Sequence, residues 1–306
     1  MPNTSAKTVL ITGGNTGIGK EVARQLALSG RFAKIYLTSR NSDKGRAAQA
    51  SLETLTGYSK FEVLPLELSD LRSVETLVER IEKMDAIVMN AGGTGGPTPD
   101  ALTPEGVTET FASNVLGHVV LLETMLEKGL LGEVAVLAGS EAARGVPKLR
   151  FPRPKFETRS VEEFASVIDG SFFHDRKFDR MLAYGQVKYI GALWISALAR
   201  KHPHLRFLTV SPGNTASTEA LRDHPAIVNF LAQKVMLRLM GHPLHVGAER
   251  LVDGVLNESL VSGIFYASAG KAITGPVVDQ AEVDPDFGRH YVQDNAYEAI
   301  HRFTPQ

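Results

Sequence analysis

The stretch TVLITGGNTGIGKEVARQLA, residues 8–27, places a β-branched apolar run directly before a glycine-rich turn and a helical pattern. Glycine permits a tight turn, and it leaves no Cβ between the backbone and an approaching phosphate group. The start of the following helix points unpaired N–H groups and a partial positive charge at the same place. Strand, glycines and helix in this order predict dinucleotide binding rather than an ordinary glycine-rich turn.

Outward from this stretch, short apolar runs alternate with longer helical patterns. The expected helices of the first half are 17–29, 43–56, 70–83 and 105–128, and the expected strands are 8–12, 34–39, 61–66, 86–90, 133–138, 205–210 and 263–267. Such alternation indicates strand–helix–strand units, which form a parallel sheet with helices on both faces. We therefore expect a single α/β domain over residues 1–306 with seven strands.

Two segments interrupt the alternation. Residues 144–180 are rich in proline, charge and phenylalanine, and residues 216–240 carry two expected short helices split at Pro225. Both are expected to be excursions from the sheet, and the aromatic content of the first predicts packing over a ligand cleft. The apolar stripe of the second favours the core, with a lid or a membrane-touching surface as the alternatives.

Composition excludes several classes of protein. The chain has 306 residues, 43% hydrophobic and 22% charged, with a formal net charge of -1, which gives no electrostatic reason to expect nucleic acid as a partner. The absence of cysteine excludes disulfides, thiol nucleophiles and thiolate metal sites, and no metal is expected. No secretory signal is evident, and no apolar run reaches the roughly 20 residues that span a bilayer. We expect a cytoplasmic protein without a transmembrane segment.

The segment YGQVK, residues 184–188, sets a tyrosine and a lysine four positions apart within a helical pattern. A free phenol has a pKa of about 10, so it is a poor proton donor or acceptor at neutral pH. A lysine one turn away on the same face favours the phenolate and lowers that pKa. Such pairs are common on helices, and this pair alone indicates only an amphipathic helix.

Six motifs follow one another in order and give the pair its context. They are TGGNTGIG (12–19), NAG (90–92), FASNVLGH (111–118), VLAGS (136–140), YGQVK (184–188) and SPGNTAST (211–218). In this set the sequence resembles the short-chain dehydrogenase/reductase superfamily over most of its length. The resemblance implies a doubly wound Rossmann fold with a seven-stranded sheet, which agrees with the strand count above.

The resemblance also implies a role for each of four catalytic residues. Tyr184 exchanges a proton with the substrate oxygen while hydride moves to or from the carbon. Lys188 holds the nicotinamide ribose and supports the phenolate. Ser140 orients the substrate oxygen, and Asn114 supports a water relay to Lys188, with a helix-packing asparagine as the alternative for that position.

The expected cofactor is NADP(H) rather than NAD(H). A carboxylate at the end of the second strand selects the ribose 2′-OH, whereas an arginine suits a 2′-phosphate, and Arg40 stands there with no acidic residue before Asp43. The family often has Asp-Leu after the third strand, where this chain has Glu67-Leu68. The full set of expected cofactor contacts is Gly13, Asn15, Thr16, Gly17, Ile18, Gly19, Ser39, Arg40, Glu67, Leu68, Asn90, Ala91, Gly92, Tyr184, Lys188, Pro212, Gly213, Thr215 and Ser217.

The resemblance is nearest the retinol dehydrogenase branch, at SRNSDKGRAAQA (39–50) and ELSDLRSV (67–74). The insertion before Tyr184 is similar to those of carbonyl reductases and of light-dependent protochlorophyllide reductases. The photoreductases carry functional cysteines and this chain has none, so that activity is not carried over. In members with such an insertion the segment can obstruct the usual dimer surface, which leaves monomer or homodimer open.

The expected substrate is a small molecule, a bulky apolar carbonyl or secondary alcohol. Phenylalanines and one isoleucine of the two excursions are predicted to border a roomy pocket for it, or else to complete the core. They are Phe151, Phe156, Phe164, Phe172, Phe173, Ile227 and Phe230. The alternatives are a non-catalytic NADP(H)-sensing regulator or scaffold, which has no chemical need for Ser140, Tyr184 and Lys188 together, a protochlorophyllide-reductase-like reductase, and a membrane-associated retinoid-type enzyme.

Overall fold

One sheet runs through the structure, a computed structural model that describes residues 7–147, 151–215, 241–270 and 272–305. Within these residues the strand order is β3-β2-β1-β4-β5-β6-β7-β8. The strands are β1 (Lys7–Ile11), β2 (Phe32–Ser39), β3 (Phe61–Pro65), β4 (Met84–Met89), β5 (Leu131–Ala138), β6 (Arg206–Val210), β7 (Phe265–Ser268) and β8 (Val277–Asp279). The chain first runs outward from β1 to β3 and then returns to β4 on the other side of β1, as a doubly wound fold requires.

The predicted parallel sheet of seven strands needs one correction. All seven expected strands are present and parallel, but the described residues hold an eighth, β8, which pairs antiparallel with β7. β8 has only three residues, and each of them is partly exposed. A run this short has no apolar periodicity, so the residue pattern does not predict this strand.

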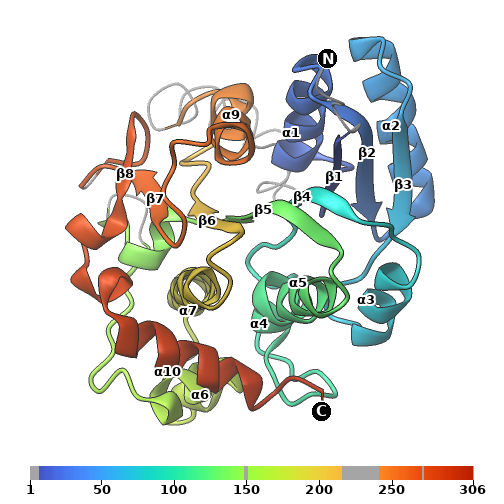
Figure 1. The fold of residues 1–306 in the computed structure, drawn as a ribbon. Coiled ribbons are helices and arrows are strands. Elements are labelled where there is room, and N and C mark those ends of the chain that lie inside the picture. Colours follow the sequence, from blue (N-terminus) through green and yellow to red (C-terminus); the bar gives the residue numbers. More distant parts are fainter. Residues whose placement is uncertain (1–6, 148–150, 216–240, 271, 306) are drawn as a thin grey trace, which may run out of the picture.

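Helices cover both faces of the sheet (Figure 1). On one face lie α1 (Gly17–Leu28), α2 (Ser42–Thr56) and α9 (Leu244–Leu256). On the other lie α3 (Leu71–Val78), the short α4 (Glu109–Phe111), α5 (Gly117–Glu127) and α7 (Arg180–Lys201). Because strands buried on both faces need apolar side chains on both, the core divides into two clusters, one on each side of the sheet.

A further layer, α6 (Val161–Ile168) and α10 (His290–His301), packs outside α7 (Figure 1). As a result α7 is buried around nearly its whole circumference. α6 lies in the predicted excursion 144–180, whose Phe156 and Phe164 pack edge-to-face with ring centroids 5.0 Å apart. Both rings belong to the core, as the core interpretation predicts, although Phe156 also lines a cavity within the excursion. The second excursion, 216–240, with Ser217, Ile227 and Phe230, lies outside the described residues.

Asp286 joins this outer layer to α7. Its carboxylate accepts hydrogen bonds from the Tyr189 hydroxyl of α7 at 3.1 Å, from Arg159 Nε and from Arg289 NH1 at 2.8 Å. The side chain is 7% exposed, so the pairing replaces the hydration that burial removes.

In the described part of the chain, no helix has the length and the apolar surface that a membrane-spanning helix needs.

We expect Asp286→Asn to lower the free energy of unfolding by about 2 to 4 kcal/mol, because it leaves the two arginines without their shared counter-charge. Urea unfolding at pH 7 measures this. Asp294→Asn is the matched control, since Asp294 pairs with Arg200 at the surface with 59% of its side chain exposed, and its loss should cost under about 1 kcal/mol. Equal losses in the two variants would contradict the role given to Asp286.

Candidate active site

The predicted site residues lie at one edge of the sheet. β1, β4, β5 and β6 are parallel and in register, so the residues that follow them, Thr12, Asn90, Ser140 and Ser211, reach the same edge. β1 lies between β2 and β4, where the strand order reverses. A crevice outside the carboxyl ends of the strands at this reversal is the usual ligand site of doubly wound folds.

The glycine turn between β1 and α1 leaves no room for side chains. Gly13 has φ 64° and Gly17 has φ 53°, conformations that favour glycine. A Cβ on Gly19 would lie 2.4 Å from the Gly13 carbonyl oxygen, and one on Gly13 would lie 3.2 Å from Ala91 Cα. Asn15 and Thr16 complete the turn, and the Thr16 side chain makes no capping hydrogen bond at the start of α1. The turn therefore fits a bound pyrophosphate, which takes backbone N–H groups as its partners.

The NAG segment after β4 fastens this turn from the side. The Asn90 amide donates to the Thr12 carbonyl at 3.0 Å, and the Ala91 N–H donates to the Thr12 hydroxyl at 2.9 Å. Gly92 has φ 143°, and a Cβ there would lie 2.4 Å from Asn114 Oδ1. The predicted cofactor contacts 90–92 are thus held against the glycine turn.

Asn114 lies in a π-helical turn, Ala112–Leu116, between α4 and α5, and is fully buried. Its Oδ1 accepts from the Gly93 N–H at 3.0 Å, and its Nδ2 donates to the Gly93 and Thr110 carbonyls, both at 2.8 Å. Because both amide hydrogens are engaged, the side chain serves to tie the 90–93 loop to the helix. If Asn114 takes part in the predicted water relay, it does so through its backbone carbonyl.

Ser140, Tyr184 and Lys188 meet at the end of β5. The Ser140 hydroxyl lies near the Tyr184 phenol and acts to lower its pKa. The Lys188 ammonium lies 5.8 Å from the centroid of the Tyr184 ring and donates to the Ala138 carbonyl at 3.0 Å. α7 carries the tyrosine and the lysine one turn apart, so the geometry predicted from YGQVK is present.

The electrostatics of the pair differ from the expectation. Burial raises the pKa of Tyr184, the Ser140 hydroxyl opposes that rise, and the charge of Glu141 adds to it. Burial lowers the pKa of Lys188 to about 8. The pKa of Tyr184 is thus raised, contrary to the lowering predicted from its lysine neighbour.

Glu141 is a site residue that the sequence did not reveal. Its buried carboxylate accepts from the Ser211 hydroxyl at 2.5 Å and the Ser268 hydroxyl at 2.9 Å, and it lies 3.5 Å from Arg250 NH1. It thereby ties the ends of β6 and β7 to Ser140, the residue before it. The only signal was a charged residue directly after a strand-end serine, and a single sequence does not tell whether such a charge points inward.

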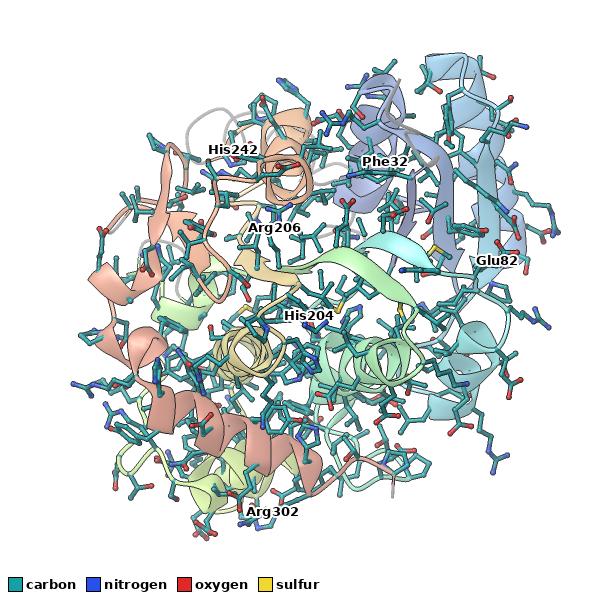
Figure 2. The ribbon with its side chains drawn as sticks, viewed as in Figure 1. Phe32, Glu82, His204, Arg206, His242 and Arg302 are labelled. Carbon is teal, nitrogen blue, oxygen red and sulfur yellow. The ribbon has the colours of Figure 1, made fainter. Side chains whose placement is uncertain are left out.

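The loop after β6 carries the predicted contacts Pro212, Gly213 and Thr215. The Gly213 N–H donates to the Ser211 hydroxyl at 3.1 Å, and a Cβ on Gly213, at φ 74°, would lie 2.5 Å from His242 Nε2. Thr215 forms an isolated parallel bridge with His242, which lies beside α9 (Figure 2). The loop is thus seated between β6 and the start of α9.

At the far end of the crevice the structure brings the predicted adenosine contacts together. Arg40, at the end of β2, is 78% exposed and lies with its NH1 3.5 Å from Glu67 Oε2. Ser39 is buried and donates to the Asn41 carbonyl at 2.8 Å, and Leu68 is buried. Arg40 thus stands beside the start of α2, where Asn41 caps the helix. The exposed guanidinium of Arg40 suits an anion.

The aromatic residues of the 144–180 excursion do not form one pocket. Phe151 lies against Tyr184, with ring centroids 6.3 Å apart, whereas Phe172 and Phe173 form a partly exposed pair. A cavity of about 910 Å³ lies within the excursion, but from α7 it is lined by Leu182 and Tyr189 rather than by Tyr184 or Lys188. This cavity, which is largely lined by charged residues, is not the predicted apolar substrate pocket.

Lys188→Met tests the buried ammonium. The folded-state pKa is about 8 and the ordinary value is 10.5, so between them the unfolded chain binds more protons. The wild type therefore bears the whole cost of the buried charge below about pH 8 and is relieved of it as pH rises to 10.5. We expect the free energy of unfolding of Lys188→Met relative to wild type to fall across this range, by up to about 3 kcal/mol.

Denaturant unfolding at pH 7, 8.5 and 10 measures that difference. Lys128→Met, at an exposed position, is the control and should show a difference that does not change with pH. A flat difference for Lys188→Met as well would remove the case for a destabilised ammonium.

Comparison with known proteins gives a consistent result. The family model for short chain dehydrogenase matches residues 7–145. A short-chain dehydrogenase/reductase of Armillaria gallica is 36% identical over 223 residues, which cover 70% of this chain and 67% of that protein. Retinol dehydrogenase 12 of Mus musculus is 32% identical over 203 residues, or 64% of this chain, and the chain spans 56% of the length of that protein.

Among solved structures, a short chain dehydrogenase from Burkholderia cenocepacia in complex with NADP superposes with a TM-score of 0.60 at 23% identity, over 85% of this chain and 94% of that one. At this identity the likeness concerns the fold. The strand order, the glycine turn and the sequence relatives agree, and the chain belongs to the short-chain dehydrogenase/reductase family, near its retinol dehydrogenase branch.

Proposed function

We propose that the protein is an NADP(H)-dependent oxidoreductase that transfers hydride between the nicotinamide and a carbonyl or secondary alcohol, with Tyr184 as general acid and base. The observation that carries this proposal is the meeting of Ser140, Tyr184 and Lys188 at the edge where the glycine turn opens. When bound, the nicotinamide supplies or accepts the hydride. Side chains of this protein supply the rest of the reaction, which is the proton transfer, the orientation of the substrate oxygen and the stabilisation of charge.

In the reductive direction Tyr184 donates its hydroxyl proton to the substrate oxygen as negative charge develops there. Because the pKa of Tyr184 is raised, the phenol holds its proton at neutral pH but is a weaker acid than a free phenol, so the transfer needs neighbours that stabilise the phenolate. The Ser140 hydroxyl, which lies near the phenol, orients the same oxygen. The Lys188 ammonium offers a positive charge to the phenolate that remains after transfer, and so limits the cost of forming it.

A non-catalytic NADP(H)-sensing regulator or scaffold is the rival. Among the described residues, no acidic side chain pairs with Lys188, although its side chain is almost fully buried. An ammonium in this position lowers stability and contributes no apolar packing, so its retention favours a chemical role. A protochlorophyllide-reductase-like activity has less support, because the chain has no cysteine.

The class of substrate and the oligomeric state remain proposals. Phe151 beside Tyr184 supports an apolar wall at the reacting centre, and hence a bulky apolar substrate. The packing of α6 and α10 on α7 covers that helix within the chain itself, which favours a monomer over a homodimer. The cytoplasmic location expected from the sequence stays a prediction.

We expect Tyr184→Phe to lower kcat/KM for NADPH-dependent carbonyl reduction by about 10²- to 10⁴-fold, because it removes the proton donor and little else. A panel of aldehydes, ketones and quinones, followed by NADPH oxidation, measures this. The NADPH Kd should stay within about twofold of wild type. Tyr189→Phe is the matched control on the same helix, since its hydroxyl bonds Asp286 in the outer layer. Tight NADPH binding with no turnover in wild type would instead support the regulator.

We expect Arg40→Ala to raise the KM for NADPH by about 10- to 100-fold, as loss of a charge-assisted phosphate contact does, and to leave the KM for NADH nearly unchanged. The exposed ion pair with Glu67 is weak and leaves the guanidinium free to turn to a 2′-phosphate. Arg46→Ala, which removes another exposed arginine on α2, is the control. Equal effects on both nucleotides would show that Arg40 does not read the 2′ position.

A further inference from the structure

His118, the last residue of FASNVLGH, is fully buried at the start of α5 and touches two parts of the site. Its Nε2 lies 2.9 Å from the Thr12 hydroxyl, at the end of β1 beside the glycine turn. Its Nδ1 lies 3.1 Å from the backbone carbonyl of Asn114. One imidazole therefore spans the distance between the predicted nucleotide site and the helix that carries a predicted catalytic residue.

The proton positions in this bridge follow from its partners. A carbonyl oxygen only accepts, so Nδ1 must carry a hydrogen and donate it to Asn114. Burial and the charge of Lys188, opposed by the hydrogen bond to the Asn114 carbonyl, lower the pKa of His118 to about 4, so the ring is neutral at pH 7. Nε2 then has a lone pair and accepts the hydrogen of the Thr12 hydroxyl.

The Thr12 hydroxyl is also accounted for, because its oxygen accepts from the Ala91 N–H at 2.9 Å. These contacts form one chain of hydrogen bonds that all donate in the same direction. The Ala91 N–H donates to the Thr12 hydroxyl, the Thr12 hydroxyl donates to His118 Nε2, and His118 Nδ1 donates to the Asn114 carbonyl. If any of these groups exchanged its donor and acceptor roles, a buried polar group would lose its hydrogen-bond partner, which is costly. The chain therefore orients a hydroxyl at the nucleotide turn and a carbonyl at the catalytic helix together.

A merely structural histidine would hold one element to another. His118 instead joins three segments that the proposed reaction needs, because the Asn114 side chain in turn clamps Gly93 through both its N–H and its carbonyl. Gly117, just before His118, lies so close to the Leu68 carbonyl that a Cβ would come within 2.2 Å of that oxygen. The end of the helix that bears His118 thus has little freedom to shift.

We propose that His118, as the neutral Nδ1–H tautomer, is a positioning residue that fixes the Thr12 hydroxyl at the nucleotide turn and the Asn114 carbonyl at the catalytic helix through its two ring nitrogens. The role given to the Nδ1 contact with Asn114 rests on the proposed function. The role of the Nε2 contact with Thr12 and the tautomer can be tested without turnover. Because the two contacts use different ring nitrogens, separate substitutions can remove each one.

His118→Asn keeps an amide donor near Nδ1 and removes the acceptor at Nε2. We expect the NADPH Kd to rise by about 3- to 10-fold while kcat stays within about twofold. His118→Gln places its amide near Nε2 and removes the Nδ1 donor. We expect the converse, a kcat lower by about 3- to 10-fold with the NADPH Kd within about twofold. Fluorescence titration gives the Kd, and steady-state kinetics give kcat.

Thr12→Val removes the partner hydroxyl and should raise the NADPH Kd as His118→Asn does. Both changes break the same contact. The NADPH Kd of the double variant Thr12→Val, His118→Asn should therefore be no higher than the higher of the two single-variant values. Ser196→Ala is the control, since Ser196 is a buried hydroxyl on the other part of α7 that bonds the Gly263 carbonyl. It should lower the unfolding midpoint and leave the Kd and kcat unchanged.

Long-range ¹H–¹⁵N spectra of the free protein report the tautomer, with the His118 signals assigned as those absent from His118→Gln. The Nδ1–H pattern at pH 7 is the expected result, and an Nε2–H pattern would overturn the proposal. Variants that change only the unfolding midpoint, as the control does, would also overturn it. If the wild type turns over no carbonyl, the proposed function fails, and the Kd and tautomer results still decide the case for His118.

Discussion

The contact of Gly19 with the Gly13 carbonyl is the constraint on which the rest of the structure depends. Since a single methyl group would come within 2.4 Å of that oxygen, only glycine lets α1 begin so close to the end of β1. That placement brings the turn against the loop after β4, where Asn90 and Ala91 bond back to Thr12. The edge of the sheet at the strand reversal is thus built from backbone, and the loop after β4 supplies groups that brace it.

Around this edge the fold concentrates polar groups that would be costly elsewhere. Glu141, His118, Lys188 and Asn114 are all buried at the same edge of the sheet. Three of them have hydrogen-bond partners for their polar atoms. Glu141 bonds with Ser211 and Ser268, His118 bonds with Thr12, and Asn114 bonds with Gly93. Lys188 is the exception, since its described partner is a single carbonyl. The least satisfied group is therefore the one whose charge the proposed chemistry uses.

Much of the fold was predictable because its signals are local. The strand expected at 34–39 appears as Phe32–Ser39, and the glycine turn and YGQVK lie where their patterns placed them. What failed depends on tertiary partners. Phe156 and Phe164 face the core because α6 packs on α7, which no residue spacing reveals. The pKa of Tyr184 follows its burial, although the sequence shows only its charged neighbour. FASNVLGH gave a helix but no hint of the π-helical turn within it.

The outer layer on α7 has a consequence for the order in which the chain assembles. Arg159 and Asp286 are separated by 127 positions, and α10 is made last among the described helices. A ribosome releases β1 to β5 long before residues 285–301, so the contacts of Tyr189 with Asp286 and Phe287 form only after the rest of α7 has been made.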